Sequence, residues 1–442
     1  MVVIYWSLLD KREKKKKREK RKSGMEEQLW TACSEGNVEE VIKLIQNEEI
    51  DINWQDAELL RTPFYRACGH SGNIEIVKLF LNDKRVDINK PQSKGATPFW
   101  IACQKGHIEI VELLLNDNRV DINEALNDGA TPFFIACKNG HIEIVKILLN
   151  EKVDIKKALN DGVTPFYIAC RKGHLEVVKL LLNDERTDIN KARNSGQTPF
   201  YIACYQRYIE IVKILLNDER VDTNKALNDG ATPFFIACWK GHIEIVKLLL
   251  NDNRININKS QSKGATPFYV VCGKGHIEIV KLLLNDERVD INKSMNDGAT
   301  PFYIACWNGK VEIVKLLLND KRVDINKAQN EDATPFYIAC QQGYIEIAKL
   351  LLKDERVDIN EARDDGQTPF LIACENGHTD IVKLLLNDKR IDMNKSTKCG
   401  STPFYIACRK GHTAIVSAFR NESNHLFILR FFLLLTALLF SL

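Results

Sequence analysis

The sequence lacks a strong net charge outside one short segment. The chain of 442 residues carries 62 Lys and Arg against 59 Asp and Glu, which gives a formal net charge of +3. Residues 1–24 alone hold ten basic and three acidic residues, so the rest of the chain is near −4. A body without excess positive charge offers no basic stripe to a nucleic-acid backbone. We therefore expect no nucleic acid among the partners.

Paired metal-binding motifs are also missing. The sequence has no CxxC pair, and its Cys and His residues do not cluster at the spacing of a zinc site. It nevertheless contains 13 cysteines, and all except Cys399 recur at regular intervals from Cys33 to Cys408. This pattern predicts no metal and no cofactor, and it points to a repeating structural role for the cysteines.

What the sequence does contain is a period. The dipeptide Thr-Pro recurs from Thr62 to Thr402 with a mean spacing of 34 residues. One interval has an extra residue within 66–75, and another lacks a residue within 150–158. A degenerate copy at 29–53 brings the total to twelve. A period of this length is typical of stacked units that bury their apolar faces against one another.

The first half of each copy predicts a short helix. In the copy that begins at Thr131, the threonine is a good N-cap, and the proline after it has no N–H to leave unpaired. Gly140 favours the left-handed conformation that ends helices. We therefore predict a helix over 132–139.

The second half of each copy predicts another helix and a finger. In "HIEIVKILLN" the residues Ile142, Val145 and Leu149 lie at i, i+3 and i+7. Ile144 and Leu148 widen this apolar stripe. The following Val-Asp-Ile-Asn alternates like a short extended segment, and Asn-Asp-Gly supplies a tight turn. Each copy is thus predicted to form helix, turn, helix and hairpin-like finger.

These residues resemble the ankyrin repeat. The family's pattern T-P-L-H-x-A-A-x-x-G-H-x-x-V-V-x-L-L-L is matched by "TPFFIACKNGHIEIVKILL" at 131–149, and the match covers roughly 26–420. The chain departs from the pattern by having Phe and a second aromatic in place of Leu-His, and Cys in place of the second Ala. The resemblance implies an all-α solenoid of about twelve repeats over residues 25–420.

Two columns of residues are predicted to be structural. Stacked helices lie roughly 8–10 Å apart, whereas disulfide Cα atoms lie within about 7 Å. The cysteines therefore cannot pair in register, and we expect small, buried, reduced core residues, which favours a reducing compartment. Histidines recur at one position of the repeat, in seven of the twelve copies, without a nucleophile or paired carboxylate that departs from the repeat. We expect them to satisfy backbone groups at the turn between helices, and we expect no catalysis.

Positions that differ between copies are the candidate binding surface, because a scaffold repeats whereas a recognition surface must vary. The resemblance places the pair before the turn glycine and the finger residues on a concave recognition face. Aromatic residues there suit binding hot spots, and drift on a solvated face is the alternative. The protein-binding candidates are Arg193, Tyr205, Gln206, Arg207, Tyr208, Trp239, Lys240, Trp307, Asn308, Gln341, Gln342 and Arg363.

One copy breaks the pattern at its turn. Where most copies have Gly-His, the sequence "YQRY" places Arg207 and Tyr208. A side chain in the left-handed conformation costs about 1 kcal/mol relative to glycine. Two interpretations stay open: a local weakening that neighbouring repeats absorb, or a hinge or binding spot beside Tyr205.

The two ends differ from the repeats. Residues 1–24 form a basic extension expected to be disordered and dispensable for the fold, with Met25 as an alternative natural start. Nuclear import, binding to acidic surfaces and a solvated charged helix all fit this extension. Residues 421–442 form a hydrophobic tail, in which 426–442 carries one charge, Arg430. As a helix it spans about 25 Å, against a hydrocarbon core of roughly 30 Å. It fits either a marginal membrane anchor or a helix covering the end of the stack.

By resemblance, the expected function is protein recognition. The chain is predicted to be an adaptor or scaffold that binds an unidentified protein partner on its concave face, as a monomer in the cytoplasm. The alternative is a membrane-tethered scaffold anchored by the hydrophobic tail, and a third hypothesis is the targeting subunit of an enzyme. Membrane-associated and nuclear locations stay open with these alternatives.

Overall fold

Thr-Pro dipeptides start the first helix of the helix pairs. The computed structural model describes residues 24–422, and in it the Thr131 hydroxyl accepts a hydrogen bond of 3.0 Å from the Phe134 amide, within helix α7 (Pro132–Asn139). The proline at the first helical position leaves no amide unpaired. The helix ends at Gly140, whose φ of 76° is left-handed. The predicted helix is confirmed with both of its boundaries.

The second helix of the same pair buries a slightly different stripe from the predicted one. Helix α8 (Ile142–Leu149) turns Ile144, Val145 and Leu148 into the core. Its two terminal residues, predicted to lie on the core face, are only half-buried. The helix contacts α7 and the second helices of the pairs on both sides. Packing from three directions therefore sets the buried face, rather than a single i, i+3, i+7 stripe.

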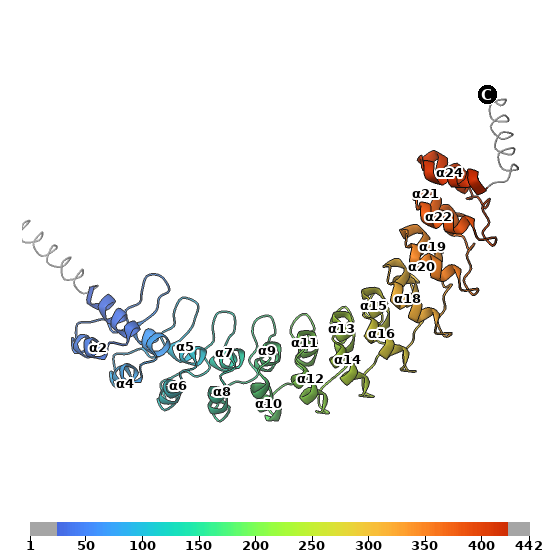
Figure 1. Ribbon diagram of the computed structural model, residues 1–442. Helices are drawn as coiled ribbons and strands as arrows, with labels where there is room; N and C mark the ends of the chain where they lie inside the picture. The colour runs from blue at the N-terminus through green and yellow to red at the C-terminus, as the bar shows by residue number, and fades with distance from the viewer. Residues whose placement is uncertain (1–23, 423–442) are drawn as a thin grey trace, which may run out of the picture. The chain divides into compact units, whose positions relative to one another are not determined.

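The described chain divides into two compact units, which meet in the sequence between Asp222 and Thr223. Unit 1 opens with a helix over 24–35. Its other helices are α2 (Val38–Ile45), α3 (Pro63–Arg66), the π-helical turn η1 (Ala67–Ser71), α4 (Ile74–Asn82), α5 (Pro98–Lys105), α6 (Ile108–Leu115), α7, α8, α9 (Pro165–Lys172), α10 (Leu175–Asn183), α11 (Pro199–Gln206) and α12 (Ile209–Leu216) (Figure 1).

Unit 2 repeats the same design. Neither unit contains a β-strand among residues 24–422, so the described fold is all-α as predicted. The helices of unit 2 are α13 (Pro233–Lys240), α14 (Ile243–Leu250), α15 (Pro267–Lys274), α16 (Ile277–Leu284), α17 (Pro301–Trp307), α18 (Val311–Leu318), α19 (Pro335–Gln342), α20 (Ile345–Leu352), α21 (Pro369–Glu375), α22 (Thr379–Leu386), α23 (Pro403–Lys410) and α24 (Thr413–Glu422).

Within each unit, equivalent helices of successive pairs pack side by side. In unit 1 the first helices α5, α7, α9 and α11 contact one another in order, and the second helices α4, α6, α8, α10 and α12 form another row. Figure 1 shows the loops of unit 1 projecting beyond the row of first helices. We call the surface made by the first helices and the fingers the front face. In most repeats the Ala-Cys pair of the first helix is buried behind it, as at Ala136 and Cys137.

The fingers are closed loops, but the predicted extended segment before them is wrong. The Leu126 amide donates to the Ala130 carbonyl at 3.0 Å and closes the finger like a hairpin. The Val-Asp-Ile-Asn segments form turns instead of strands. Asparagine side chains from the neighbouring repeat form hydrogen bonds with the backbone N–H and C=O groups that a strand would pair with another strand. Asn89 accepts from the Asp121 amide at 2.9 Å and donates to the Arg119 carbonyl at 2.7 Å.

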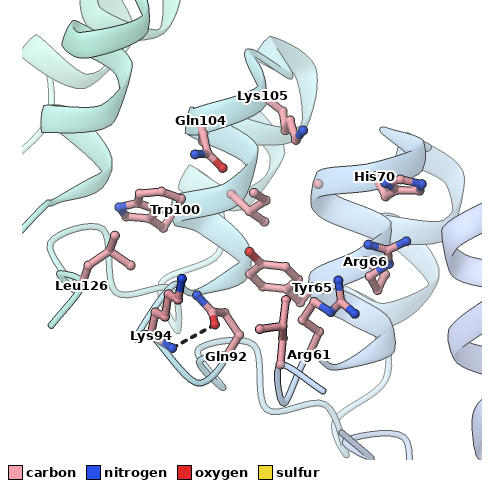
Figure 2. Close-up of a pocket in the computed structure, with 13 residues that line it drawn as sticks. Arg61, Tyr65, Arg66, His70, Gln92, Lys94, Trp100, Gln104, Lys105 and Leu126 are labelled. Carbon is pink, nitrogen blue, oxygen red and sulfur yellow. Dashed lines mark hydrogen bonds between the residues drawn. The ribbon is translucent and has the colours of Figure 1, made fainter. Parts of the chain in front are cut away.

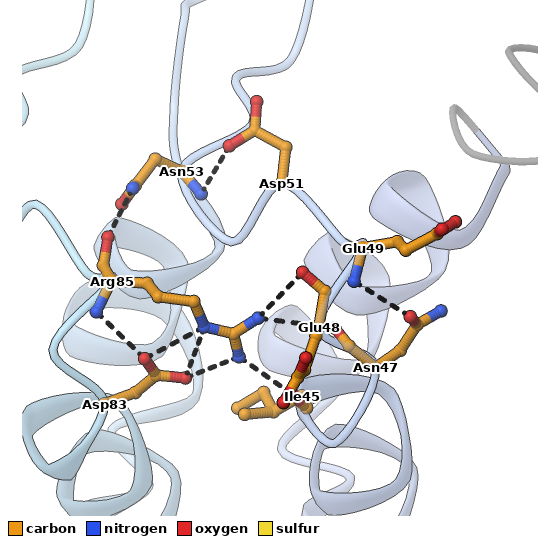
Figure 3. Close-up of polar contacts among 8 residues, drawn as sticks. All are labelled: Ile45, Asn47, Glu48, Glu49, Asp51, Asn53, Asp83 and Arg85. Atoms are coloured by element: carbon orange, nitrogen blue, oxygen red, sulfur yellow. Dashed lines mark hydrogen bonds and ion pairs between the residues drawn. The ribbon is translucent and has the colours of Figure 1, made fainter.

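A second ladder links neighbouring repeats through arginine. The Arg85 guanidinium donates to the Asp83 carboxylate at 2.6 Å and to the carbonyl of Ile45, the last residue of α2, at 2.9 Å (Figure 3). We call this arrangement an arginine staple. The arginines that make the same contact with the preceding repeat are Arg119, Arg186, Arg220, Arg288, Arg322, Arg356 and Arg390.

The two irregular intervals change the local structure. The extra residue in 66–75 is absorbed by the π-helical turn η1, which ends at Gly72. Such turns are rare and occur frequently at functional sites. The missing residue shortens the link at 150–154 and removes the staple, because Lys152 stands where other links have arginine. The Lys152 carbonyl still accepts from Asn123, at 3.3 Å.

The predicted basic extension and hydrophobic tail lie outside the described residues. The structure begins in helix 24–35, where the Glu26 carboxylate accepts a hydrogen bond of 3.0 Å from the Asp51 amide. Over residues 24–422, no helix combines the length and the apolar character needed to cross a bilayer.

Candidate functional site

The residue that follows each repeat's cysteine lies at the front face, and we call this place the post-cysteine position. The cysteine before it belongs to the last buried turn of the first helix, so the chain leaves the core here. Its side chain differs from repeat to repeat. In order, the position holds Ser34, Gly69, Gln104, Lys138, Arg171, Tyr205, Trp239, Gly273, Trp307, Gln341, Glu375 and Arg409.

In unit 2, a glycine at this position separates two tryptophans. Trp239 is 38% exposed and Trp307 is 42% exposed. Gly273 has no side chain to fill the space beside Trp239, and a hollow of about 670 Å³ opens there, which we call the aromatic hollow. The apolar and aromatic residues of its wall include Phe235, Trp239, Tyr269, Val270, Met295 and Tyr344.

Two lysine ammonium groups lie near the ring of Trp239. The Lys240 ammonium lies 4.8 Å from the ring centroid and the Lys274 ammonium lies 5.0 Å from it. Such cation–π contacts hold an aromatic ring in one orientation. Lys310 also lines the hollow, and the lining contains no Asp or Glu. The aromatic hollow therefore has an apolar wall and a positively charged rim.

Trp307 and Asn308, which the sequence predicts as a pair, have different surroundings. The Trp307 ring packs against Tyr303 with centroids 6.1 Å apart. Asn308 lines the hollow, and its side-chain Nδ2 donates to the Gly273 carbonyl at 3.1 Å. Asn308 therefore fixes two neighbouring repeats, and Trp307 adds exposed apolar surface to the front face.

The predicted finger arginines are half-buried and already have partners. Arg193 forms an ion pair of 3.1 Å with Asp161. Arg363 lies over the Tyr337 ring, 5.7 Å from its centroid. Hydrogen bonding to Tyr337 is the main cause that raises the pKa of Arg363. These contacts give both arginines a packing role between neighbouring repeats, and contact with a partner stays a prediction.

The four residues of "YQRY" are placed at the end of α11. Tyr205 is half-buried, whereas Gln206 and Arg207 are exposed. Arg207 has a φ of 65°, which confirms the left-handed conformation predicted there. Tyr208 occupies the place of the histidine column, since a Cβ on Gly173 would lie 2.7 Å from its ring. The tyrosine therefore keeps the packing of this turn.

Gln341 and Gln342 close α19, where Gln341 is half-buried and Gln342 is exposed. The Gln341 carbonyl accepts hydrogen bonds of 2.9 Å from His378 Nε2 and from the side-chain Nδ2 of Asn376. Histidines that make the same contact with the preceding repeat are His141, His174, His276 and His412. The predicted backbone role is confirmed for these five histidines, where it joins two repeats, but not for His107, whose Nε2 is buried without a hydrogen-bond partner among the described residues.

A second hollow, in unit 1, contains none of the twelve predicted residues. Gly69 holds the post-cysteine position there, and the hollow measures about 370 Å³. Figure 2 shows its side chains projecting from two helices and from the adjoining loops. We call it the basic hollow, since its lining includes Arg61, Arg66, His70, Lys94 and Lys105 and no Asp or Glu.

One sequence signal links the two hollows. Gly69 and Gly273 are the two glycines at the post-cysteine position, and each lines a hollow. A search for variable side chains overlooks them, because the feature is a missing side chain.

The buried cysteines of the column are expected to be unreactive, because burial disfavours the thiolate. Burial raises the pKa of the Cys137 thiol far above its usual range, and the same holds for the other deeply buried thiols. Cys399 and Cys408 are exposed. The prediction that all twelve column cysteines are buried is therefore wrong for Cys408, because no described first helix follows α23 to cover it. Among residues 24–422, no group of His, Cys, Asp or Glu is arranged to hold a metal ion.

Stacked helix–turn–helix pairs with projecting fingers define a repeat protein of the solenoid class. A family model described as ankyrin repeats (3 copies) matches residues 29–125, 118–193, 185–261, 253–329 and 336–426, and one described as ankyrin repeats (many copies) matches 311–352. The chain belongs to the ankyrin repeat family. No curated protein gave a significant match. Ankyrin repeats generally mediate protein–protein interaction and are typically binding modules without catalytic activity.

Proposed function

We propose that this chain is a protein-binding scaffold that holds a protein partner on its front face and performs no chemistry itself. The observation that carries the proposal is Trp239, which is 38% exposed beside the aromatic hollow that Gly273 opens. Tryptophan is enriched among residues that dominate binding energy, because a large rigid ring loses much apolar surface to a partner.

The rim of the aromatic hollow adds selectivity to this contact. Lys240 and Lys274 hold the Trp239 ring in place, so little side-chain entropy is lost when a partner covers it. The wall residues Phe235, Val270 and Met295 accept an apolar side chain. The partner segment is therefore expected to insert an apolar or aromatic residue between the two lysines.

Quantitative affinity capture tests the proposal. The full chain and a Trp239→Ala, Trp307→Ala double variant serve as baits for cell extract, and isotope-labelled mass spectrometry compares what each retains. A Met393→Ala variant is the matched control, since Met393 is also 38% exposed in unit 2 but does not line the aromatic hollow. We expect specific proteins to be lost from the double variant and retained by the control.

Thermal unfolding completes the test, because it separates binding from packing. Both tryptophans are substantially exposed, so their removal is expected to leave the melting temperature nearly unchanged. Equal capture by both baits would contradict the proposal. A large drop in melting temperature of the double variant would mean that the tryptophans are packing residues.

A further inference from the structure

We propose that the basic hollow of unit 1 binds an acidic segment of the protein partner, in which Asp or Glu side chains enter the hollow and apolar side chains lie along its aromatic wall. This inference rests on the proposed function, since it names the chemistry of a partner segment. It concerns a different hollow from the one that carries Trp239.

The shape of the basic hollow depends on two departures from the repeat. Gly69 replaces the side chain found at most post-cysteine positions, and a Cβ built there would collide with Ile101. The inserted residue of this repeat forms the π-helical turn η1, which contributes Gly69 and His70 to the lining. The insertion also has a local cost. His107 Nε2 is buried without a hydrogen-bond partner among the described residues, whereas most column histidines reach a carbonyl of the preceding repeat.

The charge of the basic hollow is one-sided. Its lining contains basic side chains and no Asp or Glu. Arg61 is matched by Asp56 at 2.6 Å. Arg66, in contrast, donates to the Ser34 hydroxyl at 2.7 Å and stacks on Trp30, 4.5 Å from the ring centroid. Neither contact neutralises its charge, so the guanidinium keeps the ability to pair with an anion.

At Lys94, a positive charge stands in place of an aspartate that stabilises the turn in other fingers. At the same place in five other fingers an aspartate accepts a hydrogen bond from a backbone amide two residues later, for example Ala130 N to Asp128 at 3.0 Å. A lysine has no acceptor and cannot make this bond. Lys94 therefore gives up the turn contact and brings a positive charge to the hollow.

The surroundings favour a peptide over other polyanions. Tyr65 and Trp100 also line the basic hollow with small exposed edges, at 9% and 5% exposure, and the half-buried Leu59 and Leu126 add apolar surface. Beyond residues 1–24 the chain is near −4 in net charge, so it carries no overall excess of positive charge. Nucleic acids and anionic membranes bind through many charges over an extended surface, whereas a short acidic segment requires only a local charge cluster.

Two labelled peptides test the proposal directly. In the first, Glu and Asp alternate with Leu and Tyr; in the second, Lys replaces every acidic residue. Fluorescence anisotropy with the full chain is expected to show binding of the acidic peptide alone, with affinity that falls as salt is added. Equal binding of both peptides, or none of the acidic one, would overturn the proposal.

Lys94→Asp is the decisive variant, because it is expected to restore the finger contact and therefore cannot lose binding through unfolding. We expect the affinity for the acidic peptide to fall about tenfold or more. The matched control is Lys263→Asp, which makes the same change at the equivalent place of a finger in unit 2. It is expected to leave peptide affinity unchanged, and equal loss in both variants would overturn the assignment to this hollow.

A second pair of lysine variants tests another part of the lining of the basic hollow. Lys105 and Lys172 are both exposed and both precede a turn glycine, but only Lys105 lines the basic hollow. Lys105→Glu is expected to weaken the peptide complex about tenfold, and Lys172→Glu is expected to have little effect. A phosphoserine version of the peptide that binds through Lys94 and Lys105 would support the anion site and identify phosphate as the source of charge.

Competition decides among classes of ligand. Single-stranded RNA or phosphatidylserine vesicles that bind more tightly than the peptide, and lose affinity in Lys94→Asp, would overturn the proposal of a protein partner. The Trp239→Ala, Trp307→Ala variant is expected to retain the acidic peptide. Failure of the peptide test with intact capture through the tryptophans would therefore remove this inference and leave the proposed function standing.

Discussion

The Arg85 guanidinium joins the Asp83 carboxylate at 2.6 Å and, with the same nitrogen, the Ile45 carbonyl of the preceding repeat at 2.9 Å (Figure 3). The carboxylate fixes the arginine, and the arginine satisfies a carbonyl that the end of helix α2 leaves without an intrahelical partner. One local pair thus becomes a joint between repeats, and the sequence repeats it in most links.

Acid is expected to open these joints. The side-chain hydrogen bond from Arg85 is the main cause that lowers the pKa of Asp83 below its ordinary value. Because the pKa is lower in the folded chain than in the unfolded chain, the pair stabilises fully above about pH 4. This contribution is lost as pH falls through the lowered value. Urea unfolding midpoints measured across this range should therefore decrease toward acid.

An Arg85→Gln variant isolates one joint. It should be less stable than the parent chain at neutral pH, and the difference should shrink toward acid because protonation of Asp83 removes the same contact. Arg207→Gln is a suitable control, since Arg207 lies at a helix end and makes no staple. A stability difference that stays constant with pH would contradict the role of the carboxylate.

Restoring the missing staple is expected to stabilise unit 1. Replacing Glu151 and Lys152 by the three residues Asp-Glu-Arg gives this link the length and sequence found at 183–186. The new arginine should reach the Leu115 carbonyl and add about 1 kcal/mol, the usual net value of a hydrogen bond. Hydrogen exchange at the ends of α6 and α8 should slow. The same insertion with Gln in place of Arg separates the effect of length from that of the staple.

Thiol labelling should divide the cysteines into two classes. Cys399 and Cys408 are exposed, whereas the other eleven are buried. Burial raises the pKa of the buried thiols, which disfavours the reactive thiolate. We therefore expect a thiol reagent to label the two exposed residues in the folded chain and the rest after denaturation. A Cys399→Ser, Cys408→Ser variant should not be labelled while folded. Rapid labelling of any other cysteine would contradict the packing described.

His70 reports the potential in the basic hollow without any ligand. Its pKa is lowered mainly by the charge of Arg66, with burial and Lys105 as further causes. An Arg66→Gln variant should therefore raise the pKa of His70 toward its ordinary value in an NMR titration. Lys172→Gln is the control, and it should leave the titration unchanged. An unchanged His70 in Arg66→Gln would mean that the hollow does not concentrate positive charge.

The sequence predicts most of the fold because the determinants are local and repeated. Thr131 and Gly140 define the two ends of α7, and the structure confirms both. The extended segment was mispredicted because its pairing comes from asparagine side chains such as Asn89, which a backbone pattern does not reveal. The burial stripe of α8 also depends on neighbours on both sides.

The candidate surface was harder to predict than the fold. Trp239 follows from its type and position, since a large aromatic side chain at a variable place is visible in the sequence. The basic hollow depends on Gly69, where the important feature is empty space, and on Lys94, whose meaning emerges only when its finger is compared with those that carry aspartate. Both require the geometry of neighbouring repeats.

Variants at "YQRY" can distinguish neutral sequence drift from a role in binding. Arg207 has a φ of 65°, so Arg207→Gly should stabilise unit 1 by about 1 kcal/mol. Tyr208→His should change stability little, because either ring packs against Gly173 and histidine can also reach the Arg171 carbonyl as the other column histidines do. Urea unfolding of the single and double variants measures both effects. If Arg207→Gly is less stable than the parent chain, the left-handed conformation of Arg207 is not a source of strain. If Arg207→Gly stabilises the chain and also abolishes capture of its partner, the arginine is a binding residue kept at a cost in stability. Unchanged capture would show that the array tolerates the strain without using it.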